Sequence, residues 1–458
     1  MRVVVIGGGI TGLATARALR EHAEVTVLEA AEEVGGQIRT IELAGARLDV
    51  GADAMLARQP EAIALAREVG LGDDLVEPRT GSVWLWVRGR LRALPGGTVM
   101  GAPTDPVALA RSGVLPPGGV LRAAVEPLLP RRELGRDRAV GDLITERYGR
   151  AVADLLVEPL LSGVYAGSID RLSTAATAPM IFSAAQEHRR LTSGLRAYRR
   201  RASATAGPVF MTLRGGLSTL VAALADDLGD RVRTATAAVG LHEQPHGWQV
   251  ETSSGVLEAD RVVVVLPAAP AARLVATAAP AVAGALEAFE TASVAVVALA
   301  YDHAGVAPLP EGSGFLVPRS EGRLVKAATW SSRKWPHLAD ADRFLLRASV
   351  GRIDDPRGLE LDDDELADRV EAEVRAATGI RVAAVERRVV RWDQAMPQYD
   401  VGHLDRVARV REALDEAPSG LHVGGAALDG VGLPARVRDA HRLAGEVLDE
   451  ADRRPVSR

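Results

Sequence analysis

Glycine occurs three times directly after a short apolar run at the start of the chain. The run, Val3 to Ile6, is predicted to be a buried parallel strand, and a helix is predicted to begin at Ile10. Between them, Gly7 permits a tight turn, Gly9 lets a phosphate approach the backbone, and Gly12 lets the helix touch the strand. The free N–H groups and positive dipole end of the helix favour an anion. These residues predict a binding site for the pyrophosphate of a dinucleotide.

An acidic residue follows at the place such a site requires. A second apolar run, Val25 to Leu28, is the predicted neighbouring strand and ends at Glu29. A carboxylate there accepts hydrogen bonds from a ribose diol. A glycine loop without a ligand is the alternative interpretation, but strand, turn, helix, strand and acid in this order favour the dinucleotide.

A second glycine turn favours a flavin over a nicotinamide. Gly35–Gly36 follows Glu29 closely, where a simple nicotinamide domain would enter another crossover helix. These glycines can pass close to a diphosphate, and Arg39 can supply positive charge to it; a plain surface charge is the alternative for Arg39. The turn at Gly51–Ala52 can bring backbone amides near an isoalloxazine ring.

A further helix start lies near the C-terminus. The strand Leu421 to Val423 leads to a turn, and Pro434 suits the first turn of the helix that follows, because its missing N–H costs nothing there. The amides of Val431 to Leu433 would point at an anion. In flavoenzymes that anion is the N1/C2=O locus, which becomes negative on reduction, so a helix start there raises the electron affinity of the flavin. A plain helix cap is the alternative.

One long segment carries a specific family resemblance. Its sequence is Arg391-Trp392-Asp393-Gln394-Ala395-Met396-Pro397-Gln398-Tyr399, followed by Gly402-His403. It resembles the W-x-x-A-x-P-Q-Y-x-x-G-H segment of the coproporphyrinogen III and protoporphyrinogen oxidases of the flavin amine oxidase superfamily, in their Gram-positive type. Pro159 to Gly167 resembles the family's P-x-x-x-G-x-x-x-G segment, and Gly51 to Arg58 resembles its G-x-D-x-x-x-x-R turn. The resemblance spans essentially the whole chain.

The resemblance implies FAD as the cofactor and a set of residues that hold it. Val239 enters this set as an adenine-side backbone contact, from its place in the strand before a predicted hairpin. The implied FAD contacts are Gly7, Gly8, Gly9, Ile10, Thr11, Gly12, Glu29, Ala30, Gly36, Gln37, Arg39, Gly51, Ala52, Asp53, Ala54, Val239, Trp392, Val431, Gly432 and Leu433.

The resemblance also implies a reaction of haem biosynthesis. Coproporphyrinogen III would lose six electrons to give coproporphyrin III, with oxygen as the acceptor and hydrogen peroxide as the second product. We predict no catalytic side chain, since the flavin carries the redox chemistry. The substrate propionates need cations, and Arg58 is the candidate because its turn is predicted beside the flavin; a solvent-facing salt bridge is the alternative. A downstream enzyme of the haem pathway is a candidate partner.

Three alternative functions stay open. The first is a protoporphyrinogen IX oxidase. Protoporphyrinogen IX carries two propionates and coproporphyrinogen III carries four, so an arginine-rich pocket favours coproporphyrinogen III. A flavin oxidase of an amine or a polyene would need an aromatic cage. The whole chain has only 6 Trp, 5 Tyr and 5 Phe, and this small number argues against such a cage. A protein that holds FAD or a porphyrin without turnover is the third alternative.

The predicted fold class is α/β, with interleaved parts. A Rossmann-like FAD-binding domain of the glutathione reductase type is expected from residues 1–80, 209–290 and 415–458. Residues 81–208 are expected to form a helical insertion, because helical periodicity recurs within them. Residues 291–414 are expected to form an α+β substrate-binding domain, with strands near Ala295 to Tyr301, Arg343 to Val350 and Val382 to Arg391.

Composition favours a cytoplasmic enzyme of more than one domain. The chain has 458 residues, of which 47% are hydrophobic, and no cysteine, which excludes disulfides, thiolate metal sites and a cysteinyl flavin link. The net charge of −5 argues against a nucleic-acid partner, and the nine histidines are too scattered to predict a metal site.

No segment of the sequence predicts a signal peptide or a membrane span. The apolar start is broken by Gly7, and the longest apolar stretch, from about Val262 to Leu286, contains Arg273 and three prolines. The basic runs Arg131-Arg132 and Arg199-Arg200-Arg201 predict at most a peripheral membrane contact.

Overall fold

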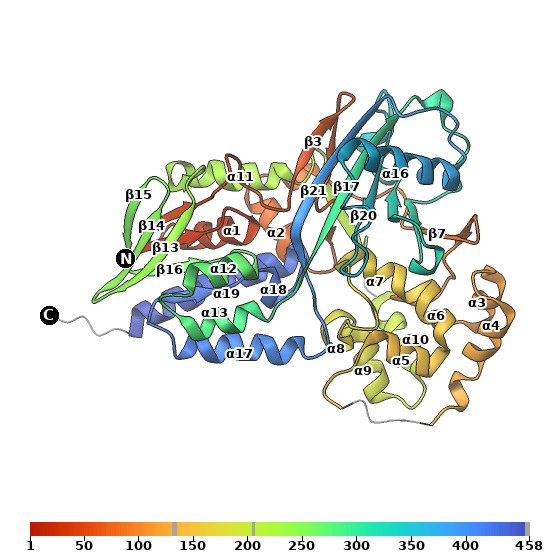
Figure 1. The fold of residues 1–458 in the computed structure, drawn as a ribbon, viewed down its shortest axis with the longest axis horizontal. Helices are drawn as coiled ribbons and strands as arrows, with labels where there is room; N and C mark the ends of the chain where they lie inside the picture. Colours follow the sequence, from red (N-terminus) through yellow and green to blue (C-terminus); the bar gives the residue numbers. More distant parts are fainter. Residues whose placement is uncertain (131–134, 204–206, 454–458) are drawn as a thin grey trace.

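A parallel sheet of five strands forms the centre of one half of the molecule, in the order β12-β2-β1-β16-β22 (Figure 1). The structure is a computed structural model that describes residues 1–130, 135–203 and 207–453. The strands are β1 (Arg2–Ile6), β2 (Glu24–Leu28), β12 (Val232–Arg233), β16 (Arg261–Val264) and β22 (Leu421–Val423). Helices cover both faces, so the strands are near-continuous apolar runs, as expected for a buried parallel sheet.

Two layers of elements pack on this sheet. One face contacts α1 (Ile10–Leu19), α11 (Ser218–Leu228), α19 (Leu433–Arg453) and α2 (Glu61–Glu68). The other face contacts α12 (Ala268–Val275), α13 (Pro280–Glu287), α17 (His403–Asp415) and the antiparallel strands β13 (Ala238–Gln244), β14 (Gly247–Thr252) and β15 (Gly255–Ala259). Alternate residues of β1 supply the two faces, since Val3 and Val5 lie in one core cluster and Val4 and Ile6 in the other.

A second sheet has seven strands, in the order β21-β17-β20-β19-β18-β7-β8. They are β21 (Glu386–Pro397), β17 (Thr291–Tyr301), β20 (Phe344–Val350), β19 (Val325–Thr329), β18 (Gly314–Leu316), β7 (Trp84–Val87) and β8 (Arg90–Ala93). One face packs on α16 (Asp363–Thr378). The opposite face packs partly on the hairpin of β3 (Thr40–Leu43) and β4 (Ala46–Asp49), near α14 (Ser331–Lys334) and α15 (Pro336–Ala339).

Helices that follow the β7–β8 hairpin form the remaining part, seen at the lower right of Figure 1. They are α3 (Pro106–Ser112), α4 (Pro117–Ala124), α5 (Val140–Tyr148), α6 (Arg150–Val152), α7 (Glu158–Tyr165), α8 (Thr174–Thr177), α9 (Pro179–Glu187) and α10 (Leu191–Ser203). Other short elements are β5 (Met55–Leu56), β6 (Leu75–Val76), β9 (Thr98–Val99), β10 (Ala102–Pro103), β11 (Phe210–Leu213) and α18 (Ala426–Asp429). The α/β fold class predicted from the sequence is confirmed.

Two segments differ from the sequence prediction. Residues 84–93, expected in the helical insertion, form β7 and β8 of the seven-stranded sheet, because Arg88 and Gly89 both adopt positive φ and close a tight hairpin turn. Helix α17, expected in the substrate-binding domain, packs through Val407 and Val410 on the core beneath the parallel sheet. The strand expected over residues 382–391 begins and ends later, as β21. The division into three domains stays a prediction.

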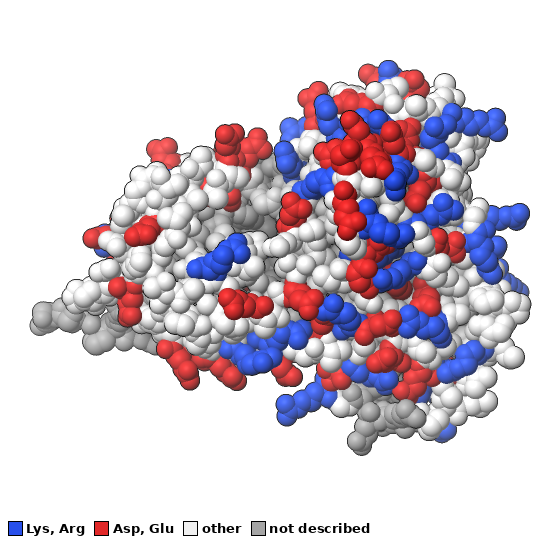
Figure 2. Space-filling view, in the orientation of Figure 1, with Lys and Arg blue, Asp and Glu red and all other residues white. Residues whose placement is uncertain are grey.

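Charges on the surface are mixed. Basic and acidic side chains are interspersed over the right-hand part of the face shown in Figure 2, a pattern typical of a solvated surface, and are sparser on the left-hand part. Arg200 and Arg201 are exposed at the end of α10, whereas the run Arg131-Arg132 lies outside the described residues. In the part of the chain that the structure describes, every helix is too short or too polar to cross a bilayer.

Candidate functional site

The turn between β1 and α1 has the geometry predicted from its glycines. Gly7 has a φ of 117°, and its N–H donates to Leu28 O at 2.8 Å. A Cβ on Gly12 would overlap Gly7 O, so only glycine lets α1 touch the strand here. A Cβ on Gly9 would meet no described atom within 4 Å. The backbone at Gly9 is therefore open to a ligand, at the start of a helix that attracts anions.

Glu29 is held in place at the end of β2. Its carboxylate accepts hydrogen bonds from Gly8 N at 2.8 Å and from Ala31 N at 2.9 Å. Thr236 N donates to Glu29 O at 2.8 Å, which ties the end of β2 to the segment after β12. Each carboxylate oxygen keeps a second lone pair for a ribose hydroxyl.

The second glycine turn lies against the first. Gly35 N donates to Gly8 O at 2.9 Å, and a Cβ on Gly36 would lie 3.7 Å from Gly9 Cα. Gly36 has a φ of 56°, a conformation that glycine adopts without strain. The two turns thus form one surface of bare backbone. The Arg39 side chain beside it is exposed and makes no hydrogen bond or ion pair within the described ranges, so both interpretations of Arg39 stay open.

The turn at Gly51–Ala52 meets the segment that carries the family resemblance. Trp392 Nε1 donates to Val50 O at 3.0 Å, and a Cβ on Gly51 would lie 3.3 Å from Trp392 Cζ2. Gln37 Nε2 donates to Ala395 O at 2.5 Å. The structure therefore brings together three predicted contact regions that are far apart in the sequence.

Asp53, in the same turn, belongs to a three-residue ion-pair cluster. Its carboxylate lies 2.8 Å from Lys334 Nζ and 3.0 Å from Arg347 Nη2. Burial would raise the pKa of Asp53, but the charges of Arg347 and Lys334 outweigh it and lower the pKa to about 2. Arg347 Nη1 also donates to Asp49 O at 2.9 Å and to Gly51 O at 2.8 Å. Both cations were missed in the sequence, because they come from α14 and β20.

Asp49 anchors the hairpin that precedes this turn. Its carboxyl accepts hydrogen bonds from Thr40 Oγ1 at 2.5 Å and from Leu217 N at 3.0 Å. Burial raises the pKa of Asp49 to about 6, against the lowering effect of these hydrogen bonds. Asp49 therefore links the β3–β4 hairpin to the start of α11.

The helix start near the C-terminus also forms as predicted. Helix α19 begins at Leu433, and Arg436 N donates to Gly432 O at 3.1 Å. Asp439 accepts a hydrogen bond from Gly425 N at 2.8 Å and pairs with Arg442 at 2.6 Å. Asp439 thus links the turn after β22 to the first half of α19.

Two residues of the family-like segment connect separate parts of the site. Tyr399 OH donates to Ala426 O at 2.5 Å, and the Tyr399 ring stacks on His403 with 3.9 Å between the ring centroids. Gln398 Nε2 donates to Tyr165 O at 2.9 Å, and a Cβ on Gly167 would lie 2.6 Å from Gln398 Oε1. The segment therefore joins α18, near the start of α19, to the glycines that follow α7.

Two predicted contacts lie apart from these regions. Val239 is 63% exposed at a bulge of β13, where the register shifts between Ala238 and Gly240. Arg58 is exposed in the turn after β5, with no hydrogen bond or ion pair to the residues that the structure describes. Neither place settles the role that the sequence predicts for the residue.

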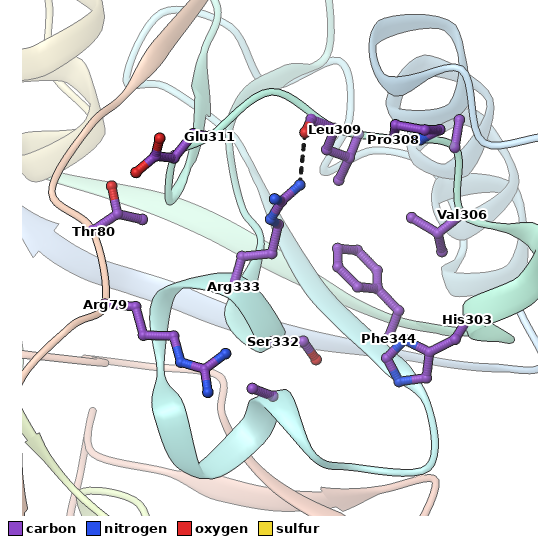
Figure 3. A pocket seen from close by; sticks show the side chains of 13 residues that line it. Arg79, Thr80, His303, Val306, Pro308, Leu309, Glu311, Ser332, Arg333 and Phe344 are labelled. Carbon is purple, nitrogen blue, oxygen red and sulfur yellow. Dashed lines mark hydrogen bonds between the residues drawn. The ribbon is translucent and has the colours of Figure 1, made fainter.

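A cavity of about 450 Å³ lies elsewhere (Figure 3). Its walls include Arg79, Arg333 and Phe344, and Arg333 Nη1 donates to Leu309 O at 2.8 Å. None of the predicted cofactor contacts lines this cavity. We therefore do not assign it to the cofactor.

The parallel sheet, its open glycine turns and the second sheet define the class of FAD-dependent oxidoreductases. The residues fit FAD, because bare backbone at Gly9 and Gly36 offers room for a diphosphate and Glu29 stands where a ribose would follow. The family model of the flavin containing amine oxidoreductases matches residues 10–448. The chain belongs to this family, in the branch of the coproporphyrinogen III and protoporphyrinogen oxidases.

Several relatives match over nearly their full length. The coproporphyrinogen III oxidase of Bacillus subtilis is 36% identical over 97% of this chain and 97% of the relative. That of Mycobacterium tuberculosis is 38% identical over 98% of this chain and 97% of the relative. A solved structure from Exiguobacterium sp. 255-15 has a TM-score of 0.89 at 32% identity and covers 99% of each chain. Cyclohexylamine oxidase from Brevibacterium oxydans, 17% identical with a TM-score of 0.73 and 99% coverage of each chain, shares the fold.

Proposed function

We propose that this chain oxidises coproporphyrinogen III to coproporphyrin III, with FAD as cofactor and oxygen as acceptor, and releases hydrogen peroxide. The observation that carries the proposal is the segment Trp392 to His403. It matches the phrase of the coproporphyrinogen and protoporphyrinogen oxidases, and it packs against the Gly51 turn and near the start of α19. Relatives named coproporphyrinogen III oxidase, 36–38% identical over 97–98% of the chain, support the same reaction.

The proposed role of the chain is to bind and orient. The glycines at Gly9 and Gly36 would hold the diphosphate, and Glu29 the ribose. When bound, FAD supplies the two-electron redox chemistry. The first amides of α19 would stabilise negative charge on the flavin ring, and Trp392 would exclude water from the Gly51 side of the site. We propose no acid or base side chain for the reaction.

The test is an anaerobic reduction of the purified protein. After a flavin spectrum is confirmed, the protein is mixed with coproporphyrinogen III and the loss of flavin absorbance is followed at about 450 nm, the band of oxidised flavin. We expect bleaching, and then coproporphyrin III and hydrogen peroxide when air is admitted. A protein that holds FAD but is bleached by no porphyrinogen would refute the proposal and favour an amine or polyene oxidase.

Protoporphyrinogen IX is the second candidate substrate. A relative named protoporphyrinogen oxidase, from the chloroplast of Oryza sativa, is 29% identical over 97% of this chain and 88% of the relative. The same bleaching experiment with protoporphyrinogen IX in parallel decides between the two, and we expect coproporphyrinogen III to react faster. We further propose a cytoplasmic location with at most peripheral membrane contact, which the interspersed basic and acidic side chains on the right-hand part of the face in Figure 2 support, and a downstream enzyme of the haem pathway as a candidate partner.

A further inference from the structure

One residue within a long strand has a backbone conformation that side chains rarely adopt. Gln394, in β21, has a φ of 47°. A left-handed φ of this kind is strained for a residue that has a Cβ. The other non-glycine residues with positive φ in the described ranges lie in turns, in a bend or at a helix end; they are Ala44, Arg88, Met100, Ala166 and Ala235. Strained backbone persists where the surrounding structure holds it, and such places cluster at functional sites.

The strained residue belongs to a bulge, where β21 leaves its partner strand β17. From Ala292 to Val294, β17 advances by two residues, while β21 advances by four between Trp392 and Met396. Ser293 alone therefore lies opposite residues 393–395, which stand outside the ladder of the two strands. Backbone groups outside a ladder need other partners.

Two hydrogen bonds supply such partners. Gln394 N donates to Ser293 Oγ at 2.8 Å, which holds the bulge to β17. Ala395 O accepts a hydrogen bond from Gln37 Nε2 at 2.5 Å. Ala395 is buried, whereas the Gln394 side chain is exposed and makes no hydrogen bond to the residues that the structure describes. The bulge thus directs one carbonyl group away from the ladder and toward the first part of the chain.

The bulge contacts both of the glycine turns that are predicted to hold the cofactor. Gln37 follows Gly36 directly, and its own carbonyl accepts a hydrogen bond from Ala52 N at 3.3 Å. At the other end of the bulge, the Trp392 ring lies against Gly51, and Trp392 Nε1 donates to the carbonyl just before that glycine at 3.0 Å. A change in the shape of the bulge would therefore change how the two turns lie relative to each other.

We propose that the bulge of residues 393–395 is a positioning element for FAD, which sets the Gly36 turn and the Gly51 turn at the separation that the cofactor needs. Gln394 determines its shape, and it acts through its backbone conformation. The inference rests on the proposed function, in which both turns hold FAD. Gln394 is a positioning residue, since it acts through its neighbours in the bulge.

Substitutions of Gln394 separate its backbone from its side chain. Q394V should weaken FAD binding by about tenfold, because a β-branched residue resists a positive φ and would distort the bulge. A tenfold change corresponds to about 1.4 kcal/mol, the size of about one hydrogen bond. Q394G should bind FAD within about twofold of wild type, because glycine adopts this φ without strain. Equilibrium dialysis of the holoenzyme against graded concentrations of FAD measures both affinities.

A matched control places the same strain elsewhere. Met100 has a φ of 48° in the turn between β9 and β10, and it is none of the predicted FAD contacts. We expect M100V to lower the thermal stability, as Q394V does, but to leave the affinity for FAD unchanged. The circular dichroism of the bound flavin at about 450 nm reports the surroundings of its ring. This signal should change in Q394V and stay as in wild type in M100V and Q394G.

Ser293 gives a second route to the same bulge. S293A removes the oxygen that accepts the hydrogen bond from Gln394 N, so we expect it to weaken FAD binding. S293T keeps the hydroxyl group and should bind FAD like wild type. This pair tests the inference even if Q394V fails to fold.

The outcomes separate the two proposals. Wild-type FAD affinity in Q394V, or equal affinities in S293A and S293T, would refute the positioning role and leave the proposed function standing. An equal loss of affinity in Q394G and Q394V would also refute it, because the side chain would then matter. An equal loss in M100V would reduce the effect to general destabilisation. If wild-type protein binds FAD but oxidises no porphyrinogen, the proposed function fails, while the FAD affinities still test the bulge.

Discussion

Replacing Asp53 by asparagine removes the carboxylate that Lys334 and Arg347 share. The pKa of Asp53 falls from 3.8 to about 2 in the folded protein, because the two cations outweigh the cost of burial. By linkage this shift corresponds to about 2 kcal/mol of stability, which is present above about pH 4 and lost as the pH falls through 2. D53N also leaves two cations without their anion, and removing one member of a buried pair typically costs about 3–5 kcal/mol. Since asparagine still accepts hydrogen bonds, we expect the lower end, about 3 kcal/mol at pH 7.

Urea denaturation at pH 7, followed by tryptophan fluorescence, measures the loss. D73N is the matched control, because Asp73 is exposed in a short 3-10 helix (Gly72–Asp74) and should change the free energy of unfolding by less than about 0.5 kcal/mol. The double variant D53N/K334Q should lose less than the sum of the single variants, since removing one cation relieves the repulsion that D53N creates. Stability of D53N within about 0.5 kcal/mol of wild type would refute the reasoning, because the cluster would then contribute nothing to folding.

Further predictions concern the glycine turn and two buried titratable groups. G9A should keep the thermal stability of the apoprotein but weaken FAD binding, since a methyl group there meets no protein atom within 4 Å and fills ligand space. G12A should lower both the thermal stability and the affinity for FAD, because its methyl group would overlap Gly7 O. Equilibrium dialysis with FAD and calorimetry of the apoprotein distinguish the two. The raised pKa of Asp49, from 3.8 to about 6, gives stability that is present below about pH 4 and lost as the pH rises through 6, about 3 kcal/mol at most. Burial lowers the pKa of His403 from 6.5 to about 4, so His403 contributes in the opposite direction, with stability present above about pH 6.5 and lost as the pH falls through 4. D49N keeps the His403 contribution alone, so between pH 4 and 6.5 its free energy of unfolding should rise with pH more steeply than that of wild type. H403F keeps the Asp49 contribution alone, so its free energy of unfolding should fall over the same range. Parallel curves of the free energy of unfolding for all three proteins would contradict both assignments.

Local pattern was enough to predict the cofactor half of the fold. The runs Val3 to Ile6 and Val25 to Leu28 form adjacent parallel strands with apolar residues buried on both faces. Each run could therefore be predicted as a strand from its apolar residues alone, without knowledge of the strand with which it pairs. The glycine turn could be predicted in the same way, because its constraints lie within twelve residues. Pro434 likewise marks the start of α19 within one helical turn.

The strands of the second sheet were harder to assign because their pairing is not local. β7 pairs in parallel with β18, more than two hundred residues later, and residues 84–93 were assigned to a helical part that follows them in the chain. The signal was present in Trp84-Leu85-Trp86-Val87 and the turn at Arg88-Gly89, which together indicate a hairpin. A hairpin shows that two strands exist, and it leaves open which sheet they join.

The cations that contact Asp53 show the same limit for charged residues, while the role of Arg58 stays a prediction. Asp53 lies in the turn before β5 and Arg58 in the turn after it, so the sequence could connect only Arg58 to the predicted flavin site. The Asp53 carboxylate is instead contacted by Lys334, 281 residues away, and by Arg347 on the next strand. A buried carboxylate needs cations that the fold can supply to it, and local sequence does not show which ones those are.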